Sequence, residues 1–187
     1  MRLAKPRIAP LSDAELGPEQ AEALEPFRPG PVLNIFRTLA HAPKALTRFN
    51  TWGGYILSRR NDLADREREI VILRTGFLCK SGYEWTQHTR IGLQSGLTAD
   101  EIARIKQGAD AGWSAADAAL IRASDELHAD QFITDGAWIE LRRHFSEKQC
   151  MDVVFTAAQY TQVSMFLNTF GVQLDEGQTL DPDLKGF

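Results

Sequence analysis

Helix start signals recur along the chain, and they constrain its fold more than any other feature of the sequence. Three segments fit the capping box, in which a Ser or Thr is followed three residues later by Glu or Gln. The pairs are Ser12 with Glu15, Thr98 with Glu101, and Ser146 with Gln149. Apolar residues between them recur at helical spacing, and no segment sustains the apolar and polar alternation of a half-buried strand. The sequence therefore predicts an all-α fold.

Nine helices follow from these signals and from the apolar periodicity. Their approximate ranges are 12–24, 33–41, 43–59, 65–79, 81–95, 98–107, 114–130, 135–144 and 146–169. Residues 1–32 are predicted to be an irregular N-terminal arm that wraps the rest of the chain, because of Pro6, Pro10, Pro26, Pro29 and Pro31. Residues 171–187 form a polar C-terminal tail that we expect to be ordered by docking. Because 187 residues suffice for one core, residues 1–187 are predicted to form a single domain.

Composition argues against several classes of function. The net charge is -4, and Lys and Arg are scattered along the chain, so we do not expect nucleic acid binding. No apolar stretch approaches the roughly 18 residues that cross a bilayer, and the N-terminus lacks an apolar signal core. A cytoplasmic protein without membrane contact is therefore expected. Cys79 and Cys150 are too few and too far apart for a disulfide framework, so the default for each is a buried thiol.

The last predicted helix carries apolar side chains on most of its faces. These residues are Val153, Val154, Phe155, Ala157, Ala158, Val163, Met165, Phe166, Leu167 and Phe170. One neighbouring helix could hardly cover so much apolar surface, which indicates either a central helix or a helix shared with another subunit. Asn168 is a polar group in this apolar setting, so it either forms a hydrogen bond at the helix end or lines a pocket.

A cluster of reactive side chains begins at Ser81. Steps of three and four residues place Ser81, Glu84 and His88 on one face of a helix. If Glu84 and His88 are buried together, the carboxylate favours the charged imidazole and gives a general acid or base. If they are exposed, they form an ordinary surface pair. Tyr83 and Trp85 flank Glu84, and such aromatic side chains would desolvate the carboxylate and form pocket walls.

The preceding helix supplies a further carboxylate, Glu69. A short connection around residues 79–81 makes the two helices antiparallel neighbours. Glu69 and His88 then lie toward the same end of the pair, but loosely aligned, since Glu69 is about three turns from Ser81 and His88 about two. Glu69, Glu84 and His88 could alternatively bind a divalent metal ion, but one histidine and two carboxylates are a weak metal signal. A nucleophilic triad is less favoured still, because no strand-to-helix elbow is recognisable.

These residues resemble the carboxymuconolactone decarboxylase and alkylhydroperoxidase D-like superfamily. The pattern in its peroxidase members is Glu, eleven residues, Cys-x-x-Cys, three residues and His, which falls here on Glu69, Ser81, Glu84 and His88. Both cysteine positions are replaced, and Cys79 lies two positions before the first of them. In such a pair, one thiolate attacks the peroxide and the other resolves the sulfenate. This chain has neither cysteine of the pair, so it lacks the usual means of peroxide reduction. The segment "YEWTQH" is similar to the decarboxylase-like branch.

The resemblance implies a helical bundle with a central antiparallel hairpin, assembled as a homo-oligomer, either a trimer or a hexamer. It also implies a lyase without a cofactor or metal that acts on a small carboxylic acid or lactone by acid-base catalysis. His88 is then the proton donor, and Glu84 or Glu69 orients and charges it. Tyr83, Trp85, Ser81 and Asn168 are candidates for substrate binding, and Arg68, Arg74 and Arg90 lie near enough to the motif to hold a substrate carboxylate.

Two alternatives to the lyase stay open at the level of the sequence. One is a peroxidase-like redox protein that uses Cys79, which predicts a sulfenate or mixed disulfide after peroxide treatment. The other is a non-catalytic oligomeric protein that has kept the pocket for a small ligand. Neither substrate nor product can be named from the sequence, because a fold does not by itself determine the reaction.

Overall fold

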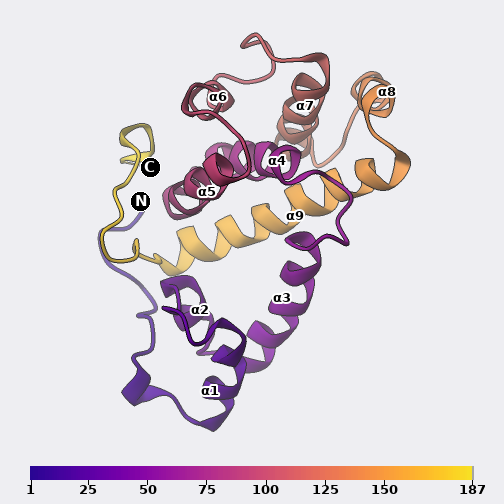
Figure 1. Ribbon diagram of the computed structural model, residues 1–187. Coiled ribbons are helices and arrows are strands. Elements are labelled where there is room, and N and C mark those ends of the chain that lie inside the picture. The colour runs from indigo at the N-terminus through magenta and orange to yellow at the C-terminus, as the bar shows by residue number, and fades with distance from the viewer. Residues whose placement is uncertain (187) are drawn as a thin grey trace.

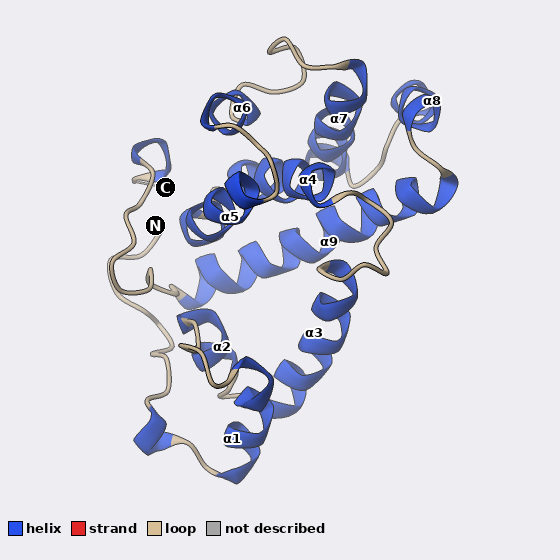
Figure 2. Cartoon of the chain, in the orientation of Figure 1, coloured by secondary structure: helices blue, strands red, loops and turns tan. Residues whose placement is uncertain are grey.

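The computed structural model describes residues 1–186, and every regular element in that range is a helix (Figures 1 and 2). The α-helices are α1 (Pro18–Leu24), α2 (Asn34–Leu39), α3 (Pro43–Ile56), α4 (Asp65–Leu78), α5 (Gly82–Gln94), α6 (Ala99–Ile105), α7 (Ala115–Asp130), α8 (Asp135–His144) and α9 (Glu147–Phe170). Short 3-10 turns occupy η1 (Asp13–Glu15), η2 (Glu25–Phe27) and η3 (Pro182–Leu184). The predicted all-α class is confirmed.

One predicted helix, 12–24, is wrong. The Ser12 and Glu15 side chains do form a capping box, but it closes only the 3-10 turn η1. The backbone is extended at Leu16 and Gly17, and α1 then begins at Pro18. A proline disfavours the helical conformation in the residue before it, so Pro18 starts a new helix and cannot continue an old one.

The hairpin of α4 and α5 lies at the centre of the molecule (Figure 1). Helix α4 packs against α5, α7 and α9, and the run Ile70, Val71, Ile72 and Leu73 is buried on all sides. A helix covered all round needs no amphipathic stripe, which explains why this run is continuously apolar. The reversal between the two helices is tight, since the Ser81 N–H donates to the Gly76 carbonyl over 2.9 Å.

Helix α9 crosses the molecule beneath this hairpin and packs against α3, α4, α5, α7 and α8 (Figure 1). These neighbours account for most of its apolar faces, as expected for a central helix. Met151 and Met165 remain exposed on it, at 45% and 61%. A second subunit covering that surface stays a prediction. Within residues 1–186, no helix is both long and apolar enough to span a membrane.

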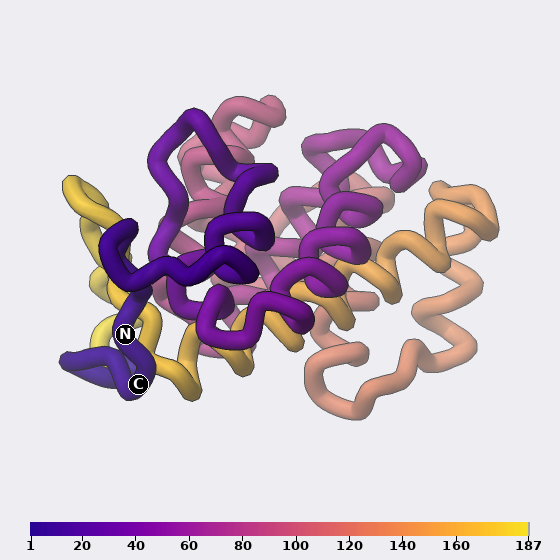
Figure 3. Tube along the Cα trace, turned by 90° about the horizontal axis from the view of Figure 1, so that it is seen from below, coloured from indigo at the N-terminus to yellow at the C-terminus, as the bar shows by residue number. Residues whose placement is uncertain are grey.

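The two ends of the chain lie side by side (Figure 3), and the Met1 ammonium donates to the Leu184 carbonyl over 3.0 Å. The tail predicted as residues 171–187 docks on α5, although Phe187 lies outside the described residues. Trp85 Nε1 donates to Asp181 Oδ2, and Lys106 forms an ion pair with the same carboxylate. The N-terminal arm also touches the rest of the fold, since the Arg7 N–H donates to the Phe170 carbonyl.

A buried carboxylate on α9 provides a test of how α3 is held in place. Asp152 is fully buried and accepts hydrogen bonds from the Tyr55 hydroxyl and the Asp62 N–H, and it forms an ion pair with Lys148. Asp152→Ala leaves the donors of Tyr55 and Asp62 without their acceptor, so we expect the free energy of unfolding to fall by about 3 kcal/mol in urea denaturation. Asp130→Ala, an exposed control, should change it by less than about 0.5 kcal/mol. Equal losses in both variants would contradict this account.

Candidate active site

Three ionisable side chains of α4 and α5 converge in the core. His88 Nδ1 lies 2.7 Å from Glu69 Oε2 in a hydrogen bond, and His88 Nε2 lies 3.0 Å from Glu84 Oε1 in an ion pair. The exposed fractions of Glu69, Glu84 and His88 are 0%, 4% and 6%. The loose alignment expected for Glu69 and His88 does not keep the two side chains apart, because they meet in this hydrogen bond. The sequence left open whether Glu84 or Glu69 is the partner of His88, and the structure shows that both carboxylates contact it.

Local sequence explains how the cluster is assembled. Glu84 and His88 are four residues apart and therefore neighbours on one face of α5. Glu69 comes from α4, and the approach of the two helices depends on Gly76, where a Cβ would lie only 3.3 Å from Glu84 Cγ. A larger residue at position 76 would push the Glu84 side chain away from its place beside His88.

The two carboxylates determine the charge on His88. Burial by itself would lower the pKa of the imidazole, but the negative charges of Glu69 and Glu84 outweigh it and raise the pKa to about 10. His88 is therefore an imidazolium at neutral pH, with both ring nitrogens protonated. A proton that is shared with a carboxylate and kept from bulk water can be delivered to a bound molecule.

The cluster opens onto a cavity of about 350 Å³ between α3, α5 and α9. Glu84 and His88 line this cavity, whereas Glu69 lies behind His88 and does not. Most of the wall is apolar, as in other small-molecule sites. The apolar and aromatic lining residues are Pro26, Phe27, Leu33, Ile35, Phe36, Phe49, Ile56, Leu57, Tyr83, Ile91, Tyr160 and Val163. Such a wall suits a small, ring-sized molecule.

Tyr83 lines the cavity, as predicted for a wall residue, and the tail fixes its position. Its hydroxyl donates to Asp175 Oδ2 over 2.6 Å, and Gln87 Nε2 donates to the same oxygen over 2.7 Å. The other oxygen of Asp175 accepts from the Asn34 N–H over 2.8 Å. The docked tail therefore fixes one wall of the cavity by joining α5 to the start of α2.

Trp85 and Ser81 do not line the cavity, although both are predicted to bind substrate. Consecutive residues of a helix point about 100° apart, so Trp85 faces away from Glu84 and packs in the core formed with α6 and α7. Its indole N–H donates to Asp181 in the tail. Ser81 sits in the hairpin turn before α5, fully buried, and its hydroxyl has no hydrogen-bond partner within residues 1–186.

Asn168 also lies outside this cavity. It is eight residues beyond Tyr160, a separation of about 12 Å along α9, and its Nδ2 donates to the Cys79 carbonyl over 2.9 Å. Asn168, Cys79 and His128 line a separate polar cavity, in which Cys79 Sγ is 3.6 Å from His128 Nδ1. Burial raises the pKa of the Cys79 thiol, which lowers the fraction of reactive thiolate.

Four polar residues of the cavity were not predicted: Asn50, Gln87, Gln159 and Tyr160. The Tyr160 ring stands at 82° to His88, with the ring centroids 4.9 Å apart. Burial, together with the charges of Glu84 and Glu69, raises the pKa of Tyr160 well above its usual value, so the phenol stays protonated. The adjacent polar residues 159 and 160 within the most apolar helix were the signal that could have identified this site.

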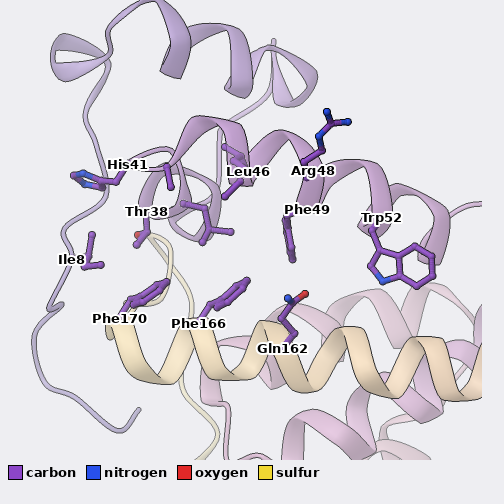
Figure 4. A pocket seen from close by; sticks show the side chains of 13 residues that line it. Ile8, Thr38, His41, Leu46, Arg48, Phe49, Trp52, Gln162, Phe166 and Phe170 are labelled. Carbon is purple, nitrogen blue, oxygen red and sulfur yellow. The ribbon is translucent and has the colours of Figure 1, made fainter.

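A further cavity of about 560 Å³ lies between the α2–α3 region and α9, and Figure 4 shows its lining. Phe166 and Phe170 stack in it with ring centroids 5.8 Å apart. Its histidine, His41, is engaged with the Ala9 carbonyl over 2.9 Å, and no carboxylate is among its lining residues. Despite its size, this cavity offers no acid-base pair, so the cavity beside His88 is the candidate active site.

The arginines near the motif differ in their availability. Arg74 is bound to Asp125 and to the carbonyls of Ile105 and Lys106, which leaves it no place in the site. Arg68 donates to Asp65. Arg90 lines the cavity, is exposed, and has no ion-pair partner in the described part of the chain. No group of three or more His, Cys, Asp or Glu residues within 1–186 is arranged to hold a metal ion.

Comparison with known proteins gives a match to one family model over part of the chain, and a fold. Residues 43–125, which include Glu69, Glu84 and His88, match the sequence model of the carboxymuconolactone decarboxylase family. No curated protein sequence matches the chain. The structure is similar to the alkylhydroperoxidase AhpD core of an uncharacterized peroxidase-related protein from Ralstonia eutropha JMP134. The TM-score is 0.78 at 19% identity, over 92% of this chain and 95% of that chain.

Two more solved structures share the fold. An uncharacterized peroxidase-related protein from Silicibacter sp. TM1040 has a TM-score of 0.71 at 15% identity, over 99% of this chain and 94% of that one. A variant of the debrominase Bmp8 in complex with 2,3,4-tribromopyrrole has a TM-score of 0.72 at 13% identity, over 92% and 94%. Identities this low establish a common fold and leave the chemistry to be argued from the site.

The raised pKa of His88 predicts how stability depends on pH. The protonated form is favoured by folding, so its contribution should be fully present below pH about 6.5, the usual pKa in an unfolded chain. It should be lost as the pH rises through about 10. The difference in free energy of unfolding between wild type and His88→Gln, from urea denaturation, should therefore be largest near pH 6 and shrink toward pH 10. A difference that stays constant over this range would contradict the assignment.

Proposed function

We propose that the chain is a cofactor-independent lyase of the carboxymuconolactone decarboxylase and alkylhydroperoxidase D-like superfamily, because residues 43–125 match the family model and the structure has the alkylhydroperoxidase D-like fold. Its substrate is a small carboxylated lactone or oxo acid, from which it removes CO2 by acid-base catalysis. The observation that carries this proposal is the imidazolium of His88, held between Glu69 and Glu84 at the wall of a largely apolar cavity. This arrangement supplies a proton in a place shielded from water.

The reaction has two steps. The bond between the carboxylate carbon and the ring breaks, CO2 leaves, and the electron pair moves through the substrate to its carbonyl oxygen, which becomes an enolate oxygen. His88 then gives its Nε2 proton, which it shares with Glu84, to the substrate carbon, and the enolate electron pair forms the new C–H bond. The imidazole regains a proton from solvent, so one proton is consumed for each CO2 released.

The two carboxylates have different tasks in this scheme. Glu69 holds His88 Nδ1 from behind and does not line the cavity, so it orients the ring and stabilises its charge. Glu84 lines the cavity beside Nε2 and can take part in moving the proton toward the substrate. Arg90, exposed at the cavity and without an ion-pair partner among residues 1–186, can bind the substrate carboxylate before it leaves as CO2.

Thiol-based peroxide reduction is the competing assignment, and the site offers little support for it. The sequence has two cysteines, and both are free. Burial raises the pKa of Cys79 and also that of Cys150, whose Sγ faces the Phe145 carbonyl. Cys79 lines the polar cavity with Asn168, away from the wall formed by Glu84 and His88. Neither thiol therefore has the lowered pKa of a peroxidatic cysteine.

The lyase proposal is tested by His88→Gln, which removes the proton and keeps a polar side chain of similar size. The assay is CO2 release from carboxymuconolactone and from a panel of small carboxylated lactones and oxo acids. We expect turnover by the wild type and a loss of at least about 100-fold in the variant, the usual contribution of a general acid. The matched control is His144→Gln, since His144 forms an exposed ion pair with Glu140, also four residues apart. It should retain full activity.

Two results would contradict this assignment. Full activity of His88→Gln would show that His88 is not the proton donor. If the wild type released no CO2 from any acid of the panel, the lyase proposal would be wrong. Circular dichroism of each variant establishes that loss of activity is not loss of fold.

Peroxide treatment separates the lyase from the redox alternative. At equimolar hydrogen peroxide and neutral pH, we expect mass spectrometry to find Cys79 and Cys150 unmodified, because a thiol with a raised pKa has little thiolate to react. Rapid formation of a sulfenate or mixed disulfide at Cys79, absent from a Cys79→Ser variant, would instead support the peroxidase.

A further inference from the structure

The cavity beside His88 contains polar groups that the acid-base scheme does not use. Asn50 lies on α3, and Gln159 and Tyr160 lie on α9. Asn50 Nδ2 and Gln159 Oε1 are buried and have no hydrogen-bond partner. Within residues 1–186, no hydrogen bond reaches any other polar side-chain atom of these three residues. A buried polar group without a partner destabilises the fold, so the presence of two such groups in one cavity wall calls for an explanation.

The three residues line one cavity, and contacts relate them to one another and to His88. Asn50 and Gly53 are three residues apart and share one face of α3. A Cβ at Gly53 would lie 3.7 Å from Gln159 Nε2, so this face of α3 meets the Gln159 amide directly. Gln159 is only 4% exposed, and the neighbouring Tyr160 carries its phenol next to His88, ring to ring at 4.9 Å. The Gln159 amide therefore lies against α3, and the Tyr160 ring lies against His88, in the wall of the same cavity.

All three residues can donate a hydrogen bond without carrying a charge. Each amide has an NH2 group, and either orientation of the amide can be reached by rotation of its last side-chain bond. The phenol of Tyr160 stays protonated because burial and the charges of Glu84 and Glu69 raise its pKa well above the usual value. Neutral donors in a shielded cavity are suited to an oxygen that gains negative charge during a reaction.

We infer that Asn50, Gln159 and Tyr160 form a carbonyl-binding subsite for the substrate oxygen that takes up the electron pair released with CO2. This inference rests on the proposed function and narrows its substrate class. The substrate carries a ring carbonyl, of a lactone or a ketone, conjugated to the carbon that loses its carboxylate. The carbonyl oxygen accepts hydrogen bonds from the amides and the phenol, and the carboxylate points toward Arg90.

Binding of two inert probes tests the subsite without any turnover. 5-Oxotetrahydrofuran-2-carboxylate has the ring carbonyl, and tetrahydrofuran-2-carboxylate lacks only that group. By calorimetric or NMR titration, we expect wild type to bind the first about tenfold more tightly, as two or three net hydrogen bonds would allow. Gln159→Met and Tyr160→Phe, which keep the length or the ring of the side chain, should each reduce this ratio at least about threefold.

Gln162→Met is the matched control, since Gln162 lies on the same helix but lines the cavity of Figure 4. It should leave the ratio unchanged. Equal affinity of wild type for the two probes, or a ratio that survives both Gln159→Met and Tyr160→Phe, would overturn the subsite. The binding test and the activity assay can fail separately. A preference for the carbonyl probe without CO2 release supports the subsite and contradicts the lyase reaction. CO2 release without that preference supports the lyase reaction and contradicts the subsite.

Discussion

Burial of three ionisable side chains between α4 and α5 is the constraint on which the rest of the structure depends. A carboxylate in the core is strongly disfavoured unless a positive partner is at hand. Glu69 and Glu84 therefore require the proton on His88, and His88 keeps that proton because of them. The three groups are stable only as a set. A slip of one turn between α4 and α5 would separate the set, so the tight hairpin turn and Gly76 are requirements of the site as much as of the fold.

The surrounding elements then decide which polar groups face the cavity. Asp175 in the docked tail accepts hydrogen bonds from Tyr83 and Gln87, so these two wall residues are engaged. On the opposite walls, Gln159 and Tyr160 have no such partner in the described part of the chain. The cavity thus has a satisfied side at α5 and an unsatisfied side at α3 and α9. Polar groups without a partner beside His88 can give a molecule bound there a defined orientation.

The sequence predicted the helices well, and the site in part. Helical spacing brought Glu84 and His88 together, the short helix connection placed Glu69 toward the same end of the hairpin, and the family pattern matched all three positions. Spacing along one helix is local information, whereas the direction of Trp85 and the depth of Asn168 depend on which elements pack around them. Asn50 and Gln159 are 109 positions apart in the sequence, so no local pattern could join them. The break at Gly17 could have been read from Pro18, and the capping box at Ser12 outweighed it in the prediction.

In the proposed lyase, the replacement of a cysteine by Glu84 gives His88 a different role from the one it has in a thiol peroxidase. In the peroxidase pattern, the position of Glu84 belongs to the second cysteine, and a histidine four residues later can take the proton from that thiol. A carboxylate at this position has the opposite effect, because its charge binds the proton on His88 and raises the pKa to about 10. In the proposed lyase, the imidazole is therefore an acid that holds a proton for carbon, whereas in the peroxidase pattern it is a base that activates sulfur. The proposed change of chemistry follows from Glu84 and from the loss of the cysteine at position 81, while Glu69 and His88 match the pattern.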